Sequence, residues 1–487
     1  MRKILPFAVV LLLMAVSVLA ACSSDPSDAD RQTYSTLDST YTYSTHGAGT
    51  DSSPYYSIIY SVESTADTLF LQSAVEGYEL TTISSMGGCG SDTLVIPRTV
   101  TVISDSAFDF FGNLKRIVFL GDRPEGKFPA GVSILALQGS SGWDPSDGVE
   151  TMKVSQSTGG ARYFVLDGKA VVIGGTGPRI SIPSADPEGN PFTTVASESF
   201  RESDVESVAF GDSIEDIGTR AFYNCIKLSS VSLPPSLVKV GDEAFRYCIS
   251  LGDVDLHKVR EIGFESFRDC RSFSSIVIPD TLETLGGGAF YLCRGAVSID
   301  IGSLTELPER TFGYCTSLES IDLSDVRSIG LSAFNTCRSL EKVVLGSVED
   351  IGMYAFYGCM SLGGMDFGPH LLSVDDEAFS ECLSIVDIRF PDTLQRMGKN
   401  VFFHANNLED IYFEGRMPSM PDDPFPGLPD LKVHINGDNA QSWSSYDGNL
   451  IIEGGSSDRS DYTLIIAAVA VVVLASASFL VLRRRSR

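Results

Sequence analysis

The sequence predicts a solenoid of stacked short repeats, in which each repeat adds one turn of chain to a common core. The first observation is a phrase that recurs from Val195 to Phe413, with its clearest copy at Ile217 to Leu237. The second is a marker phenylalanine in each copy, always 22 or 23 residues after the previous one. These markers are Phe200, Phe222, Phe245, Phe267, Phe290, Phe312, Phe334, Phe356, Phe379 and Phe402. One repeat cannot bury its apolar side alone, so the copies are expected to stack.

Each repeat is expected to contain a short strand with one buried face. Counted from Cys225, apolar residues stand at plus three, six and eight, as Leu228, Val231 and Leu233. The last two flank a serine, which is the alternation typical of a half-buried strand. Ala221-Phe222 precedes the cysteine, and we expect this pair to lie in a helical or 3-10 turn that returns the chain. The predicted fold class is therefore short parallel β-strands joined by helical or 3-10 turns.

The repeated phrase I-G-x-x-A-F-x-x-C-x-x-L-x-x-V-x-L-P resembles the BspA-like, or Treponema pallidum-type, leucine-rich repeat family. The period lies within the window of roughly 20–29 residues used by leucine-rich repeats. The resemblance implies a surface-exposed, curved solenoid that often serves in adhesion to host or matrix proteins and to other cells, and it transfers no catalytic residues. The repeats at Phe200 and Phe402 depart from the pattern, with Ser203 and Ala405 in place of the cysteine.

A second, degenerate repeat block at residues 55–143 precedes the main solenoid at 195–414, with Phe108 as its marker. The only two tryptophans, Trp143 and Trp443, close the same Gly- and Pro-containing motif after the two blocks. We interpret 121–143 and 415–446 as caps, because the last turn of a solenoid must hide its apolar end. The alternative is two chance loops that each carry a tryptophan. Residues 144–194 are expected to form a joint and an entry hairpin that turns at Asp167-Gly168.

The two ends of the chain have the composition of targeting segments. Met1–Ala21 has a basic start and an apolar run typical of a signal peptide. Cys22 ends a pattern that resembles a lipobox, which implies lipidation there; ordinary peptidase cleavage nearby is the alternative. Residues 22–54 contain almost no aliphatic side chains, so we expect a flexible spacer, with room for a strand at its end.

After a polar stalk at 447–462, residues 463–482 carry no charge and match the length of a transmembrane helix. The arginine-rich tail at 483–487 is expected to stay cytoplasmic, which places the body outside the cell. The predicted location is therefore the cell surface, with the chain anchored in the membrane by this helix and by a lipid if Cys22 is modified. The alternative is a sorting tail that is removed after export.

The net charge narrows the possible partners, and the cysteine pattern narrows the possible disulfides and metal sites. The net charge of −27 argues against nucleic acid, which needs a basic face. Eight of the ten cysteines keep the repeat period, from Cys225 to Cys382. Stacked parallel side chains are too far apart for unstrained disulfides, so we expect a column of buried thiols and no disulfide, although spacing alone leaves pairing open. No spacing suits a metal, and no cofactor is implied.

In each repeat, the strand residues five and seven positions after the cysteine are expected to point out of the core, on the concave face. Their side chains are mostly Ser and Asp, with few large groups. The candidate ligand-binding residues are Asp253, Asp255, Asp300, Asp322, Asp366, Asp387, Arg389, Asp410 and Tyr412. The alternative is a solvated face kept polar for solubility, because binding hot spots are usually Trp, Tyr or Arg, and only Arg389 and Tyr412 qualify.

No motif of an enzyme is present, and the five histidines are scattered. The sequence therefore predicts a non-enzymatic, adhesin-like surface protein that presents its Ser/Asp-rich sheet face to an extracellular protein or glycan. The alternative is a structural envelope protein or spacer without a specific ligand.

Overall fold

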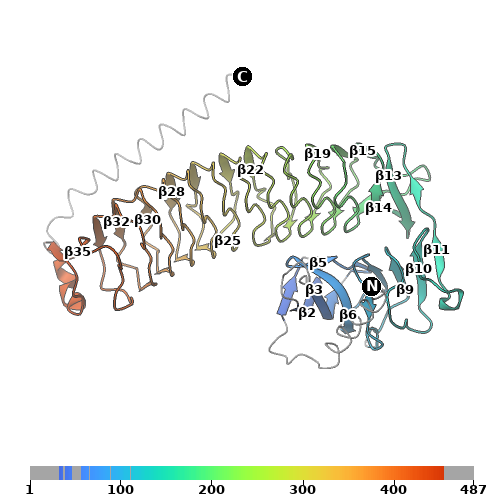
Figure 1. Cartoon of the computed structure of the whole chain (residues 1–487), viewed down its shortest axis with the longest axis horizontal. Coiled ribbons are helices and arrows are strands. Elements are labelled where there is room, and N and C mark those ends of the chain that lie inside the picture. Colours follow the sequence, from blue (N-terminus) through green and yellow to red (C-terminus); the bar gives the residue numbers. More distant parts are fainter. Residues whose placement is uncertain are drawn as a thin grey trace, which may run out of the picture. The chain divides into compact units, whose positions relative to one another are not determined.

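The computed structural model describes residues 32–36, 39–46, 56–64, 66–87, 89–109 and 111–453. These residues belong to two compact units: unit one takes in the chain up to 319 together with 333–337, and unit two takes in 320–332 and the chain from 338 onward. Both are built of short strands and turns (Figure 1). Helix within the described ranges is limited to the 3-10 segments η2 (Pro145–Asp147) and η3 (Gly437–Trp443).

Several predicted segments lie outside the described residues. They are the signal peptide at 1–21, the lipidation site Cys22, most of the stalk, the membrane helix at 463–482 and the basic tail at 483–487. Within the part of the chain that is described, no helix has the length and apolar character needed to cross a membrane.

The N-terminal block of unit one is a small solenoid opened by an antiparallel meander. Its strands are β1 (Gln32–Ser35), β2 (Ser39–His46), β3 (Tyr56–Ser64), β4 (Thr68–Phe70), β5 (Ala74–Val75), β6 (Tyr78–Gly87), β7 (Thr93–Ile96), β8 (Val102–Ile103), β9 (Arg116–Phe119), β10 (Ser133–Leu137) and β11 (Glu150–Met152). Strands β3, β6 and β8 form one parallel ladder, and β4, β7, β9, β10 and β11 form the other.

The sequence predicts a flexible spacer over 22–54 with room for a strand at its end, but the described residues of this segment contain two strands: β1 pairs with β2, and β2 pairs with β3. The physical reason is that Tyr41 and Tyr43 bury their rings almost completely. Aromatic side chains bury a large area each, so a segment that is poor in aliphatic residues still joins the core.

Both tryptophan motifs lie near the end of a parallel ladder and pack against it in the same way. Trp143 packs on Phe119 of β9, with ring centroids 5.0 Å apart, after β10 has extended the ladder. In unit two, Trp443 packs on Phe413 at 4.7 Å after the equivalent added strand. Each ladder then gains one more parallel strand beyond the predicted cap, so residues 450–453 of the predicted stalk belong to a sheet.

An antiparallel hairpin leads into the main repeats. It consists of β12 (Ser155–Gln156), β13 (Ala161–Leu166) and β14 (Lys169–Gly175), and the last two are joined by Asp167-Gly168. Both turn residues have positive φ, of 50° and 74°, as a two-residue hairpin turn requires. Phe164 and Val171 of the hairpin pack against Val95 and Val118, so the hairpin covers the outer side of the N-terminal block's second ladder.

The repeats of unit one carry two rows of strands. The first row consists of β15 (Arg179–Ile182), β17 (Ser207–Phe210), β19 (Ser230–Ser232), β22 (Ser275–Val277) and β24 (Ser298–Asp300). The second row consists of β16 (Phe192–Val195), β18 (Asp216–Ile217), β20 (Lys239–Val240), β21 (Glu261–Ile262), β23 (Thr284–Leu285) and β25 (Glu306–Leu307). Neighbouring strands that pair within these rows are parallel, as stacked turns require.

Unit two repeats this arrangement, and Figure 1 labels β28, β30, β32 and β35 among its rungs. Its first row is β26 (Ser320–Asp322), β28 (Lys342–Leu345), β30 (Asp366–Phe367), β32 (Asp387–Phe390), β34 (Asp410–Phe413), β35 (Lys432–Asn436) and β36 (Leu450–Glu453). Its second row is β27 (Ser328–Ile329), β29 (Asp350–Ile351), β31 (Ser373–Val374) and β33 (Arg396–Met397). We call the solvent side of the first row, in either unit, the strand face.

The return turn of each repeat is not helical, which corrects the sequence prediction. Arg220 and Asn224 flank Ala221-Phe222 with φ of 55° and 56°, and equivalent positive values recur in the other repeats. The Phe222 N–H does not bond within its own turn but donates to the Ala244 carbonyl of the next repeat at 2.7 Å. Left-handed residues cost about 1–2 kcal/mol each, and bonds between repeats offset that cost.

The marker phenylalanines form the predicted internal column. In unit one the rings from Phe200 to Phe334 stack with centroids 4.9–5.9 Å apart, and in unit two Phe356, Phe379 and Phe402 stack at 5.4 and 5.8 Å. All ten are buried.

The cysteines within the described residues are free and buried. Cys225 and Cys248 donate their thiol hydrogens to the carbonyls of Phe200 and Phe222, at 2.9 and 3.1 Å. The same bond recurs at Cys270, Cys293, Cys315, Cys337 and Cys382. Each thiol therefore acts as a small apolar group with one hydrogen bond to the repeat before it.

Candidate ligand-binding face

The strand face carries the predicted candidate residues, but the structure divides them into two groups. Three of the aspartates are bonded in local turns, and of these Asp300 and Asp322 are the last residues of their strands. Asp255, Asp300 and Asp322 each accept the backbone N–H two residues ahead, at 3.0–3.1 Å. Such a side chain replaces a backbone acceptor at a turn, which explains the periodic aspartate without a ligand.

Asp253 also has a structural role. Its carboxylate accepts the N–H groups of Ser274 and Ser275 at 2.6 and 3.1 Å and bonds both hydroxyls. Residues 253–255 form no strand, and at this position the bonds from the Asp253 side chain hold the next repeat. Partial burial acts to raise the pKa of Asp253, but the hydrogen bonds outweigh it and lower the pKa. They therefore favour the charged carboxylate, which is the form that accepts these bonds.

The second group lies at the C-terminal end of the face, in unit two. Arg389, Tyr412 and His434 occupy paired positions on β32, β34 and β35. The Arg389 guanidinium lies 4.3 Å from the centre of the Tyr412 ring, and the His434 ring stacks on the other side at 4.3 Å. This three-member stack, which we call the Arg–Tyr–His stack, contains Tyr and Arg, two of the side-chain types that dominate binding energy at interfaces.

Carboxylates hold the His434 ring in place. Its Nε2 lies 2.6 Å from Asp410 Oδ1, and its Nδ1 lies 3.0 Å from Glu453 Oε1. Lys432 reaches the same Asp410 at 3.6 Å. Burial is the main cause that raises the pKa of Tyr412, and the nearby negative charge of Asp410 raises it further. The hydroxyl therefore stays protonated and can donate a hydrogen bond.

Two further candidates, Asp366 and Asp387, flank the stack on β30 and β32, and both are exposed. Sequence reasoning selected Arg389, Asp410 and Tyr412 but missed His434, because it stopped counting at the cap. The signal was available: His434 follows Tyr412 by 22 residues, which is the repeat period itself.

Unit one has an open groove of about 670 Å³ along its own first row. Its floor is formed by small side chains of β15, β17 and β19, such as Ser181, Ala209 and Ser232, and Arg179 lies at its side. The volume suits a ligand, but the lining has one charged group and no aromatic anchor. The Arg–Tyr–His stack is therefore the stronger candidate for a binding centre.

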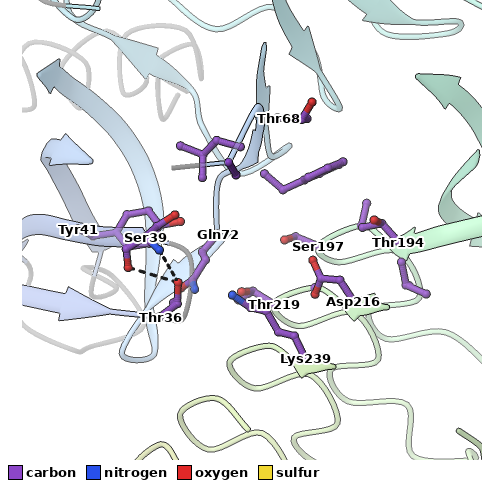
Figure 2. Close-up of a pocket in the computed structure, with 16 residues that line it drawn as sticks. Thr36, Ser39, Tyr41, Thr68, Gln72, Thr194, Ser197, Asp216, Thr219 and Lys239 are labelled. Carbon is purple, nitrogen blue, oxygen red and sulfur yellow. Dashed lines mark hydrogen bonds between the residues drawn. The ribbon is translucent and has the colours of Figure 1, made fainter. Parts of the chain in front are cut away.

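A smaller polar cavity lies between the N-terminal block and the second row of unit one (Figure 2). Tyr41 and Gln72 face Asp216, Thr219 and Lys239 across it. Its volume of about 90 Å³ is that of a few water molecules, at roughly 30 Å³ each. The cavity is too small for a macromolecular partner. It marks the contact between the N-terminal block and the second row of unit one.

Parallel rungs with a buried phenylalanine column and a polar strand face define a leucine-rich repeat solenoid. The family model described as "BspA type Leucine rich repeat region (6 copies)" matches residues 193–319, 254–348 and 327–446, which together span more than half of the chain. The chain therefore belongs to the BspA-type leucine-rich repeat family.

Solved structures with the same type of fold come from several bacteria. A leucine-rich repeat protein of Bacteroides ovatus is 20% identical over 61% of this chain and 98% of its own, with a TM-score of 0.41. A leucine rich cell surface protein of Faecalibacterium prausnitzii is 20% identical over 64% and 96%, with a TM-score of 0.42. The Treponema pallidum leucine rich repeat protein is 18% identical over 52% and 91%, with a TM-score of 0.26. The comparison with curated proteins found no match.

Proposed function

We propose that this protein is a surface-exposed binding protein, adhesin-like, that holds an extracellular protein or glycan on its strand face. The single observation that carries the proposal is the Arg–Tyr–His stack, the one place among the described strand-face residues where three large side chains adjoin. Membership in the BspA-type family supports a surface location. The predicted membrane helix and lipidated Cys22 would supply the anchor.

The surroundings of the stack favour a protein partner over a sugar. Sugars bind aromatic residues by lying flat on a free ring face, but Arg389 and His434 cover both faces of Tyr412. The Tyr412 hydroxyl remains as a polar contact, and the exposed Asp387 is positioned to pair with a basic side chain. A partner segment with Lys or Arg beside an apolar group fits this chemistry.

The test is binding of the ectodomain, residues 23–460, to an array of purified extracellular proteins and glycans. Tyr412→Ala should weaken capture of the bound component by roughly 30-fold or more, since a hot spot contributes about 2 kcal/mol or more. Val277→Ala is the matched control, because Val277 is an exposed residue at the same strand position in unit one. It should leave binding unchanged.

The second candidate function is a structural spacer in the envelope. The aspartates committed to turns favour it, because they show that much of the strand face is polar for reasons of folding. Under this hypothesis the array gives only weak, salt-sensitive binding that does not saturate, and Tyr412→Ala has no effect.

A further inference from the structure

The N-terminal block is bonded to the second row of unit one through residues far apart in the sequence. Arg220 donates to the Gly77 carbonyl at 3.0 Å, and Ser73 donates to the Thr219 carbonyl at 3.5 Å. Gly77 lies so close to the repeats that an added Cβ would meet Phe264 at 3.4 Å. The contact surrounds the polar cavity, where Figure 2 shows Gln72 and Thr219 on opposite sides.

Asp242 is the central titratable group of this contact and is only 1% exposed. The Tyr34 hydroxyl of β1 donates to its Oδ1 at 2.6 Å, and the Phe264 N–H donates to the same oxygen at 2.8 Å. The Gln72 amide, with its nitrogen turned toward the carboxyl group, reaches Oδ2 at 3.3 Å. Two of these three partners, Tyr34 and Gln72, come from the N-terminal block.

The charges around Asp242 do not neutralise it. Lys239 is a cation that acts on Asp242, but it is paired with Glu261 at 3.1 Å. Glu243 adds further negative charge beside Asp242. The other titratable groups that face it are the Tyr41 and Tyr43 hydroxyls of β2, which are neutral because burial raises their pKa.

We propose that seating of the N-terminal block on the repeats is controlled by a proton on Asp242. When the block is seated, Tyr34 and Gln72 exclude water from this carboxyl group, and a buried carboxylate without a cation of its own is costly. When the block is released, the carboxyl group returns to water and is charged at neutral pH.

The direction of the pH effect follows from linkage. Burial raises the pKa of Asp242 in the seated state to about 7, against an ordinary value of 3.8. Between pH 3.8 and about 7 the seated state therefore binds more protons than the released state. The free energy of seating weakens as the pH rises through this range and is constant above it. The loss is roughly tenfold for each pH unit in that window.

Hydrogen exchange on the full-length chain tests the proposal. Protection of segments 32–46 and 236–266, corrected for the intrinsic exchange rate, should fall by roughly 30-fold between pH 5.5 and pH 8.5. Segment 356–402 of unit two is the internal reference and should keep constant protection. Constant protection of the first two segments over this range would overturn the proposal.

Asp242→Asn removes the proton that is exchanged but keeps the shape, so its protection should not change with pH. Asp376→Asn is the matched control, because Asp376 occupies the same repeat position and accepts the Lys399 N–H at 2.7 Å, away from β1. It should keep the wild-type profile. An Asp242→Asn profile that follows the wild type would refute the role of Asp242.

Tyr34→Phe provides a second test if Asp242→Asn does not fold. It removes a hydrogen bond that favours the charged carboxylate, so the seated pKa of Asp242 rises further and the pH above which protection becomes level should move upward. An unchanged upper limit of the fall would count against the proposal.

Discussion

The phenylalanine column offers a quantitative test of the fold. Phe245 is 0% exposed, and its ring stacks on Phe222 at 5.1 Å and on Phe267 at 5.3 Å. Truncation of a buried phenylalanine to alanine costs about 3–5 kcal/mol. Because Phe245 has a ring on both sides, and each aromatic pair adds about 0.5–1.5 kcal/mol, we expect Phe245→Ala to lie in the upper half of that range.

Urea unfolding followed by circular dichroism measures this cost. Phe245→Leu keeps most of the apolar volume and loses only the two ring pairs, so it should cost about 1–3 kcal/mol. Phe403→Ala is the matched control: Phe403 is half-buried, outside the column, and stacks on its neighbour His404. It should cost about 1 kcal/mol. If Phe245→Ala proved no more harmful than Phe403→Ala, the column would not be the core of the repeats.

Three further predictions follow from the described contacts. The ectodomain at residues 23–460 should expose nine thiols to alkylation when denatured without reductant and none when native at pH 8, since all nine are buried, and burial raises the pKa of Cys337 to about 12; fewer than five in the denatured state would indicate disulfides. Asp253→Ala should cost about 2–3 kcal/mol in urea unfolding, because it removes the acceptor of two serine N–H groups in the next repeat. Asp255→Ala should cost about 1 kcal/mol, because it removes the acceptor of one N–H group within its own turn; equal costs would contradict the role of Asp253 in linking the two repeats. Glu243→Ala should cost about 1.5–3 kcal/mol, because it removes the buried carboxylate that Arg220 and Arg246 share and leaves them Glu79 and Glu265 as their acidic partners, whereas Glu283→Ala, which breaks an exposed pair, should cost below about 1; similar values would show that burial is unimportant here.

Local pattern alone misled the sequence interpretation in two places. The Ala-Phe pair suggested a helical turn, but its phenylalanine N–H bonds the next repeat, and the turn closes through left-handed residues such as Arg220. The scarcity of aliphatic residues before Tyr56 suggested a flexible segment, but buried tyrosines hold β1 and β2 in a sheet. In both cases the deciding partner belongs to another part of the chain, which a local pattern cannot represent.

The sequence by itself determined the stacked repeats, the phenylalanine column and the register of the strand face. It could do so because every repeat adjoins its neighbours, so that a residue and its equivalent 22 or 23 positions later meet in space. Only the tertiary structure decided which aspartates serve turns, which side chains form the Arg–Tyr–His stack, and that Tyr34 bonds Asp242 across 208 residues. Those contacts depend on side-chain geometry and on packing between distant segments, and no repeat period encodes them.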